Sequence, residues 1–241
     1  MSLDDLAPTS PLRVVGDDPR PTEREGGVAL WLGAGAPLRS IRWLDGACAT
    51  AAKFGGAIAI AAGDPTWLDL AADRATRAQI ACVGIPTDLK LDYLGWAQVV
   101  AAAARQLGSK TILVDEASRP ERFPEVAGIA ELLDAAQLTH VVALAPDGPI
   151  IHASRMAGSD LQTVRIRGSA VIGLRVAGPA IEEYPTPTPS SAMKRLDLPA
   201  LGLDPVVLGH RALPPRTSPP ARKTVEKVAD YLASHLRAKD S

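Results

Sequence analysis

The sequence is poor in several features that would identify a class of protein directly. Only two cysteines occur among 241 residues, Cys48 and Cys82, and an isolated pair in a chain of this length indicates no disulfide framework. The formal charge of −1 and the pI of about 6.4 give no electrostatic reason to expect a nucleic-acid partner or an anionic membrane. The longest apolar runs, "GGAIAIAAG" and "VVAAAA", are far too short to span a bilayer.

The opening stretch "MSLDDLAPTSPLRVVGDDPRP" also lacks the apolar core segment of a signal peptide. Because the cysteines are so few, we expect both to be plain buried thiols. Together these features predict a protein of the reducing cytoplasm with no membrane span.

Motifs of common reactive sites are missing as well. No glycine-rich loop ends in Lys-Ser or Lys-Thr, and no Gly-x-Ser-x-Gly elbow is present to carry a serine nucleophile. The stretch "GAGAP" (33–37) follows a strand as a dinucleotide fingerprint does, but Leu38 stands at the third glycine position and Pro37 in the turn. We interpret it as an ordinary strand-to-helix turn.

Titratable side chains form no evident catalytic group. The histidines lie on different predicted elements, and only His140 and His152 fall on adjacent predicted strands. No spacing between histidines predicts a metal site. Asp115 with Glu116, and the pair at 182–183, have the chemistry for acid–base work, but we expect both pairs to be solvated surface charge. The sequence therefore predicts a ligand-binding fold without catalytic or metal-ligating residues.

An alternation of strands and helices dominates the first half of the chain. Short, continuously apolar strands are predicted at 27–33, 57–63, 79–85 and 110–116, and helices at 44–56, 65–76, 91–108 and 124–135. Strands of this kind are typical of a parallel sheet that is covered on both faces. We therefore predict a doubly wound, mostly parallel α/β fold of the adenine-nucleotide-binding, Rossmann-like type.

The pattern changes at residue 138. Strands are predicted at 138–146, 150–156, 161–168 and 170–178 with no helix between them, and "PDGP" and "AGSD" have the composition of hairpin turns. We expect an antiparallel addition to the parallel half.

The predicted elements divide the chain into four segments. Residues 1–26 are an irregular N-terminal arm, 27–176 the α/β domain with its antiparallel addition, 177–220 a proline-rich recognition loop and linker, and 221–241 a C-terminal amphipathic helix. Pro185, Pro187 and Pro189 lack an amide donor and fix an extended, stiff backbone. The C-terminal helix has one apolar face, which either folds back on the domain or clasps a partner.

Three stretches, in this order, resemble the small (beta) subunit of electron transfer flavoproteins. They are "IAELLDAAQLTHV" (129–141), "VRIRGSAVIGLRV" (164–176) and "EEYPTPTPSSAMKRL" (182–196). The last is similar to the family's Arg-Tyr-Pro-Ser-Leu-Pro-x-Ile-Met-Lys loop, with Tyr184, Pro185, Met193 and Lys194 as the matching residues. The resemblance covers about residues 27–205.

The resemblance implies a heterodimer. In that family an alpha subunit holds most of the FAD that carries the redox chemistry, and the beta subunit shelters part of the flavin and binds AMP or, in some members, a second FAD. The family loop docks on flavin-dependent dehydrogenases, which here assigns docking to Tyr184, Pro185, Pro187, Thr188, Met193 and Lys194. A stiff loop suits this role because little chain entropy is lost on binding.

Ligands of doubly wound sheets bind at the carboxyl ends of the strands. That position and the resemblance together give our candidate cofactor-binding residues: Gly33, Ala34, Gly63, Asp92, Glu116, Arg119 and Arg122. Asp92 also fits an ordinary acid at a helix N-terminus.

The chain departs from the family where the nucleotide phosphate binds. The family's Asp-Gly-Asp-x-x-Gln-x-Gly is replaced by "RPERFPEVAG" (119–128), in which bulky residues and proline stand where glycines allow close backbone approach. Either Arg119 or Arg122 supplies a phosphate-binding charge instead, or the AMP site is lost or remodelled. The alternatives to an electron-transfer subunit are an adenine-nucleotide-dependent enzyme of the related α/β class and a non-redox scaffold subunit that has lost its nucleotide.

Overall fold

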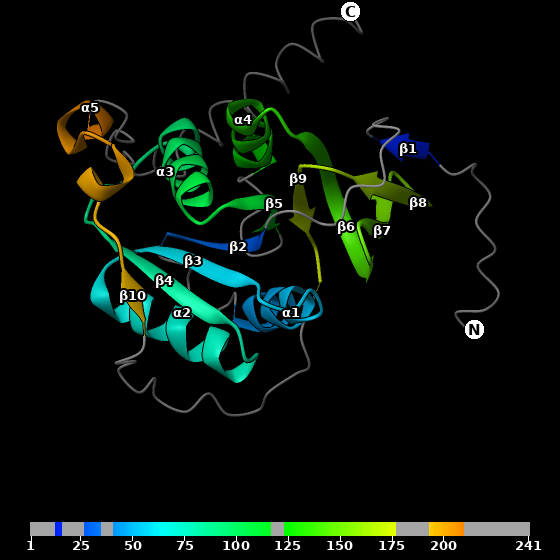
Figure 1. The fold of residues 1–241 in the computed structure, drawn as a ribbon, viewed down its shortest axis with the longest axis horizontal. Helices are drawn as coiled ribbons and strands as arrows, with labels where there is room; N and C mark the ends of the chain where they lie inside the picture. Colours follow the sequence, from blue (N-terminus) through cyan, green and yellow to red (C-terminus); the bar gives the residue numbers. More distant parts are fainter. Residues whose placement is uncertain (1–12, 16–26, 35–40, 117–122, 177–192, 210–241) are drawn as a thin grey trace, which may run out of the picture.

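The fold is described from a computed structural model, which places residues 13–15, 27–34, 41–116, 123–176 and 193–209 (Figure 1). The predicted C-terminal helix, the proline-rich segment from 177 to 192, and Arg119 and Arg122 lie outside these residues. The elements in chain order are β1 (Arg13–Val15), β2 (Gly27–Ala34), α1 (Ile41–Ala52), β3 (Ile58–Gly63), α2 (Pro65–Arg77), β4 (Ala81–Pro86), α3 (Tyr93–Gln106), β5 (Ser109–Asp115), α4 (Phe123–Leu133), β6 (Ala136–Asp147), β7 (Ile150–Ala157), β8 (Asp160–Arg167), β9 (Ala170–Leu174), β10 (Lys194–Arg195), the 3-10 turn η4 (Pro199–Leu201) and α5 (Pro205–Gly209).

All described strands join one sheet, in the order β1-β8-β7-β6-β9-β5-β2-β3-β4-β10. Neighbouring strands in the run β6-β9-β5-β2-β3-β4-β10 are parallel to one another. Strand β7 runs antiparallel to both of its neighbours, β6 and β8. The chain builds outward from β2 through β3 to β4 and then returns to the other side of β2 with β5. This reversal confirms the predicted doubly wound α/β fold.

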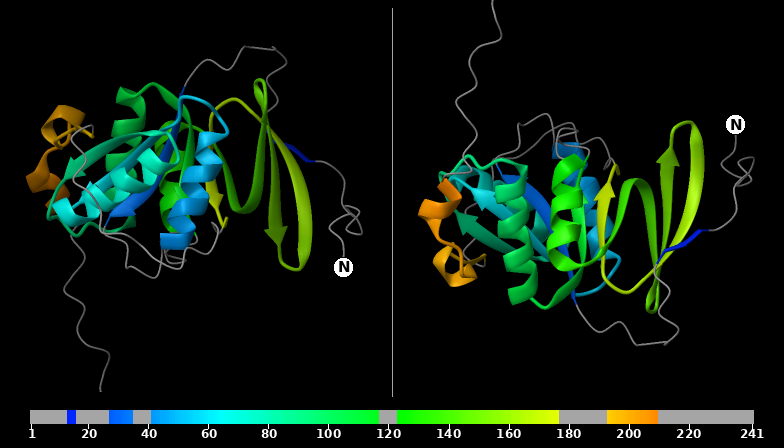
Figure 2. Two further views of the ribbon diagram at one scale, coloured as in Figure 1. Left: turned by 90° about the horizontal axis from the view of Figure 1, so that it is seen from below. Right: turned by 90° about the horizontal axis from the view of Figure 1, so that it is seen from above.

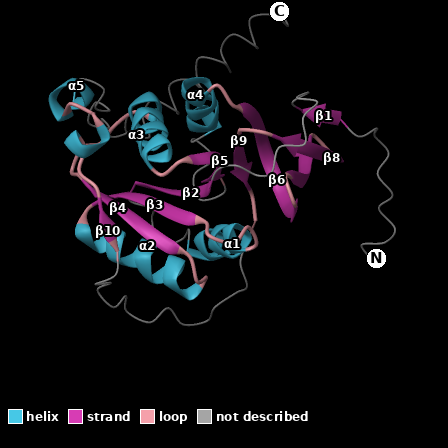
Figure 3. Ribbon diagram, in the orientation of Figure 1, coloured by secondary structure: helices cyan, strands magenta, loops and turns pink. Residues whose placement is uncertain are grey.

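Helices cover both faces of the parallel part of the sheet (Figures 1 and 3). On one face α1 and α2 pack over strand residues such as Leu30 and Leu113, and on the other α3 and α4 pack over Ile60 and Ile112. The alternate positions of each strand therefore supply two separate cores. Continuous apolar strands are the sequence signature of this arrangement, because both faces of each strand are buried.

Strand β9 was assigned wrongly to the antiparallel addition. It lies parallel between β5 and β6, in the middle of the sheet, and all five of its residues are buried. The uninterrupted apolar run of Ala170–Leu174 is itself the signal of such a central strand. The hairpins β6–β7 and β7–β8 form as predicted, at the predicted turns.

Two boundaries also need correction. Residues 13–15 of the expected irregular arm form β1, which pairs with β8. Residues 193–209, expected in a linker, belong to the globular part, because Leu196, Leu198 and Leu208 are buried in the α3–α4 core. The two edge strands of the sheet are thus only three and two residues long, and short edges limit pairing with other chains.

Within the described ranges, no helix is both long enough and apolar enough to cross a membrane.

Candidate functional site

The reversal of strand order places the candidate site beyond the carboxyl ends of β2 and β5. Four predicted residues stand at strand ends on this edge: Gly33 and Ala34 of β2, Gly63 of β3 and, directly after β5, Glu116. The segments that follow β2 and β5, 35–40 and 117–122, lie outside the described residues.

The glycines at this edge have left-handed backbone angles and carbonyl groups that are bound internally. Gly33 has φ of 93°, and its carbonyl accepts a hydrogen bond of 2.9 Å from the indole Nε1 of Trp67, in the first turn of α2. Gly63 has φ of 140°, and its carbonyl accepts from the amide of Thr87 at 3.1 Å. Ala34 is half-buried beside Gly33. Hydrogen bonds within the chain therefore fix the backbone at the carboxyl ends of β2 and β3.

Glu116 and Asp115 are not solvated surface charges, contrary to our expectation. Glu116 is fully buried, and Asp115 is 1% exposed. The Glu116 amide donates to the carbonyl of Leu174 at 3.1 Å, and its carboxyl Oε2 accepts from the amide of His140 at 2.9 Å. Its other oxygen, Oε1, is buried and accepts no hydrogen bond from the described residues. Both acids are buried because Asp115 is the last residue of the buried strand β5 and Glu116 directly follows it.

Gly173 of β9 makes room for this carboxyl group. A Cβ atom at Gly173 would lie 2.8 Å from Oε2 of Glu116 and 2.9 Å from its carboxyl carbon. The bonded amide belongs to His140, whose φ is 59°. The register of β6 against β9 shifts here, between Leu138 and Val141, and its register against β7 shifts next, between Val141 and Ala143. Glu116 therefore holds the point at which β6 turns from the parallel sheet into the hairpins.

A third carboxyl group lies in the first turn of α4. Glu125 is 4% exposed, and its Oε2 accepts a hydrogen bond of 3.1 Å from the indole Nε1 of Trp31 on β2. The ring of Trp31 lies 5.9 Å from that of Trp96 on α3, centroid to centroid. Neither Glu125 nor its partner Trp31 was predicted from the sequence as a site residue. The signal for Glu125 is an acid that follows a proline at the start of an apolar run, which marks a helix N-terminus.

Two helix N-termini at this edge, those of α2 and α3, are capped by carboxyl groups of the chain. Asp64 caps α2 by accepting from the amide of Trp67, at 2.9 Å, and Asp92 caps α3 by accepting from the amide of Gly95, at 2.7 Å. Glu125 stands in the first turn of α4. A nucleotide phosphate needs free amides at such termini. The amides of Trp67 and Gly95 are therefore not free to bind a phosphate, and Asp92 has the capping role.

The predicted docking residues within the described ranges have separate positions. Met193 is 9% exposed and belongs to the core, where a Cβ atom at Gly84 would lie 2.7 Å from its sulfur. Its neighbour Lys194 is exposed on β10, opposite Val83. Met193 therefore anchors the end of the segment and is not available to a partner. The remaining docking candidates, Tyr184, Pro185, Pro187 and Thr188, lie outside the described residues.

No metal centre is formed by the residues that the structure places: no three His, Cys, Asp or Glu side chains there are grouped to hold an ion. His140 and His152 are not opposite one another, because His152 pairs with Ala145. Both cysteines are free and buried, as predicted. Burial raises the pKa of the Cys82 thiol from 9.0 to about 12, and burial and the nearby Asp45 raise that of Cys48 further.

One buried ion pair lies away from the carboxyl edge. The fully buried Arg74 of α2 is 3.5 Å from Asp45 of α1. Burial nevertheless raises the pKa of Asp45, because desolvation outweighs the attraction of Arg74. The pair joins two helices on one face of the sheet and has a structural role.

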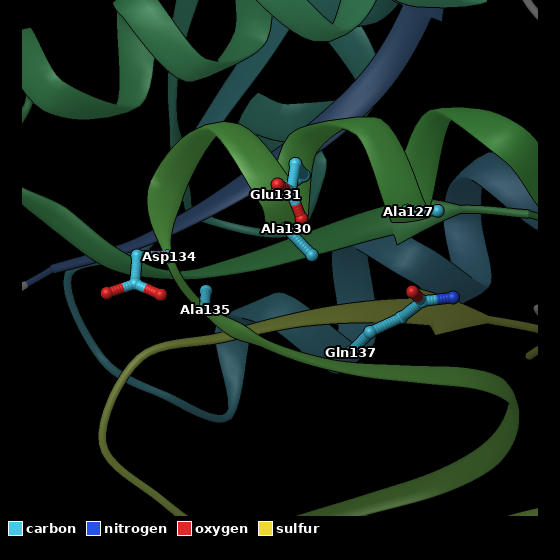
Figure 4. A pocket seen from close by; sticks show the side chains of 6 residues that line it. All are labelled: Ala127, Ala130, Glu131, Asp134, Ala135 and Gln137. Carbon is cyan, nitrogen blue, oxygen red and sulfur yellow. The ribbon is translucent and has the colours of Figure 1, made fainter.

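A shallow depression lies at the opposite edge of the sheet (Figure 4). It has a volume of about 180 Å³ and lies where α4 ends and β6 begins, lined by Ala127, Ala130, Glu131, Asp134, Ala135 and Gln137. Because β6 is parallel to β9, this is the amino-terminal edge, and the depression is not part of the candidate site.

Comparison of the sequence with protein-family models finds no match, and comparison with curated proteins finds none either. A functional assignment of this chain therefore depends on its own residues.

Proposed function

We propose that this chain is a beta-like subunit of a heterodimeric electron transfer flavoprotein, located in the cytoplasm. The alpha-like partner holds most of the FAD, and the complex receives electrons from a flavin-dependent dehydrogenase. FAD supplies the redox chemistry when it is bound; the contribution of this chain is a rigid α/β body and a docking segment.

The anchoring of the described residues on either side of the proline-rich segment is the observation that carries the proposal. At one end, the amide of Arg175 donates to the carbonyl of Val141 beside the central strand β9. At the other end, Met193 is buried and the amide of Leu196 donates to the carbonyl of Gly84 at 2.9 Å. Four strands lie between β9 and β10 in the sheet, so the described residues that flank the segment are held at separate places in the sheet. A proline-rich sequence with both flanks held suits the dehydrogenase-docking loop of the family it resembles.

The other resembling stretches support the same proposal by their place in the fold. Residues 129–141 span the end of α4 and the start of β6, and residues 164–176 include the end of β8 and all of β9. These elements form one neighbourhood at the side of the sheet that carries the hairpins.

Co-expression tests the proposal. The full chain is produced with a flavoprotein alpha-like subunit encoded beside it, and the complex is purified through a tag on this chain. We expect a yellow heterodimer containing FAD. A stable, colourless monomer that ignores such a subunit would count decisively against an electron-transfer role.

The scaffold alternative is favoured by one observation. The capped N-termini of α2 and α3 are unsuited to a phosphate, as expected of a subunit that has lost its nucleotide. A heterodimer that forms without flavin would select this alternative. The same caps disfavour an ATP-dependent enzyme, for which calorimetry would have to find ATP bound and turned over.

A further inference from the structure

The outer face of the β7–β8 hairpin is defined by strand register. His152 pairs with Arg165, Ser154 with Thr163, and Met156 with Leu161, so these six side chains share one face. Arg167, two residues beyond Arg165, lies on the same face. We call this the hairpin face. The opposite face, which includes Ile151, Val164 and Ile166, is buried in the core.

Among the described elements, no helix packs extensively against β7 or β8. Both views in Figure 2 show the hairpin standing clear of the helices that cover the rest of the sheet. Each of the six paired side chains of the hairpin face is partly or fully exposed. A half-exposed sheet face of this kind is available to a partner.

One end of the hairpin face is apolar. Met156 and Leu161, opposite one another across the two strands, are 39% and 38% exposed. Both belong to the few large apolar side chains that the described chain leaves exposed. Clustered apolar side chains at a surface are typical anchors of protein interfaces.

The other end is basic. Arg165 and Arg167 lie about 7 Å apart along β8, from the rise of an antiparallel strand. Neither forms an ion pair with the described residues, and the Nε of Arg165 is buried without a hydrogen-bond acceptor. His152, beside Arg165, lies 3.5 Å from the exposed Asp147. Between the two ends lie the short polar side chains of Ser154 and Thr163.

We propose that the hairpin face binds a protein surface in which an apolar patch is bordered by carboxylates, and that this surface belongs to the flavin-carrying subunit. The identity of the partner rests on the proposed function. The apolar pair anchors the contact, and the arginines select an acidic partner. The heterodimer contact and the dehydrogenase-docking segment then occupy different parts of the chain.

A second copy of the chain does not satisfy this face. A two-fold axis along the strands would bring the basic end against the basic end of the other copy. An axis across the strands would bring the basic end against Met156 and Leu161. The first arrangement sets the arginines of both copies against each other with only Asp147 of each copy, already beside its own His152, to offset them, and the second sets arginines against apolar side chains. We therefore infer a different chain as the occupant.

Oxidation of methionine provides a test that does not depend on a substitution. Full-length chain, alone and in the purified complex with the alpha-like subunit, is exposed briefly to hydrogen peroxide, and sulfoxide is measured by peptide mass spectrometry. We expect Met156 to be oxidised at least about tenfold more slowly in the complex. The buried Met193 is the internal control and should resist oxidation in both samples.

A charge-reversal series tests the basic end. Arg167→Glu, at an exposed position, and Arg165→Glu should each weaken the complex about tenfold or more, an effect that grows at low salt. Lys53→Glu with Lys110→Glu, both exposed and outside the hairpins, is the matched control and should leave affinity unchanged. Thermal melts of each variant alone establish that it is folded.

The outcomes separate the two proposals. If no complex forms, both are refuted. If a flavin-containing complex forms but Met156 is oxidised as fast as in the free chain, the hairpin-face proposal alone is refuted. Protection of Met156 that accompanies a homodimer, or a duplex DNA bound through Arg165 and Arg167, would also overturn it.

Discussion

At the scale of single residues, the carboxyl edge is shaped by one buried acid and the glycine that accommodates it. Glu116 occupies the space that a side chain at position 173 would fill, and its carboxyl group holds the amide of His140 at the bend of β6. The Glu116 side chain therefore fits between strands β9 and β6 only because position 173 has no side chain.

This match predicts that Gly173→Ala destabilises the fold by about 1–3 kcal/mol, since the new methyl group overlaps a buried carboxyl. Urea unfolding measures the change. In the Glu116→Ala background the same substitution should cost much less, whereas equal costs in both backgrounds would mean that the two residues do not compete for space.

The two buried thiols give a pH prediction. The folded-state pKa of Cys82 is raised from 9.0 to about 12 by burial, so its contribution to stability is complete below pH 9 and is lost as the pH rises toward 12. Between those values the unfolded chain releases a proton that the folded chain retains. The free energy of unfolding should therefore fall more steeply in the parent than in Cys82→Ala. Identical slopes in urea titrations at pH 8 to 11 would contradict this prediction.

At the scale of elements, the short strand β10 closes one edge of the sheet with two exposed residues, and a buried residue precedes it. Met193 precedes the strand and is buried against Gly84, and Lys194 begins it and is exposed. We predict that Met193→Ala lowers the free energy of unfolding by about 2–3 kcal/mol, because it leaves a cavity. Lys194→Ala, its neighbour and control, should change stability little. A stable Met193→Ala variant with impaired partner binding would instead support the docking role that the sequence suggested.

The capped helices give a second prediction at this scale. Asp92→Ala should cost about 1 kcal/mol of stability through loss of the α3 cap, and parent and variant should both fail to bind AMP. Differential scanning fluorimetry with AMP, ADP and ATP measures both effects. An AMP-dependent rise in melting temperature that Asp92→Ala abolishes would reinstate Asp92 as a nucleotide ligand.

The elements themselves could largely be predicted from the sequence. Continuous apolar strands and capped helices depend on neighbouring residues, and the four β-then-α units have the expected order. The neighbours of a strand in the sheet depend on contacts that are remote in sequence. For this reason β9 was expected beside β8 and lies instead between β5 and β6, and the burial of Glu116 follows from that placement.

The candidate site was less predictable for the same reason. Asp92 was recognised as an acid at a helix start because capping is local. The bonds from Trp31 to Glu125 and from Trp67 to Gly33 join residues on different elements, and spacing along the chain does not indicate them.

At the scale of the whole molecule, the chain is a doubly wound sheet with two features beyond its nucleotide-type core. One is the proline-rich sequence between β9 and β10, whose described flanks are held in the sheet, and the other is the hairpin pair β6–β8, with one face exposed. At the carboxyl edge, acids of the chain cap α2 and α3, and Glu116 is buried. A body of this kind suits a subunit that presents surfaces to other proteins.

Analytical sedimentation of the co-expressed pair, followed through the visible absorbance band of the flavin, tests the central proposal most directly. For the proposed heterodimer, we expect the flavin to sediment as one species whose mass is the 25.2 kDa of this chain plus that of a single alpha-like subunit. Flavin that sediments with the alpha-like subunit alone, while this chain remains a separate colourless species, would contradict it.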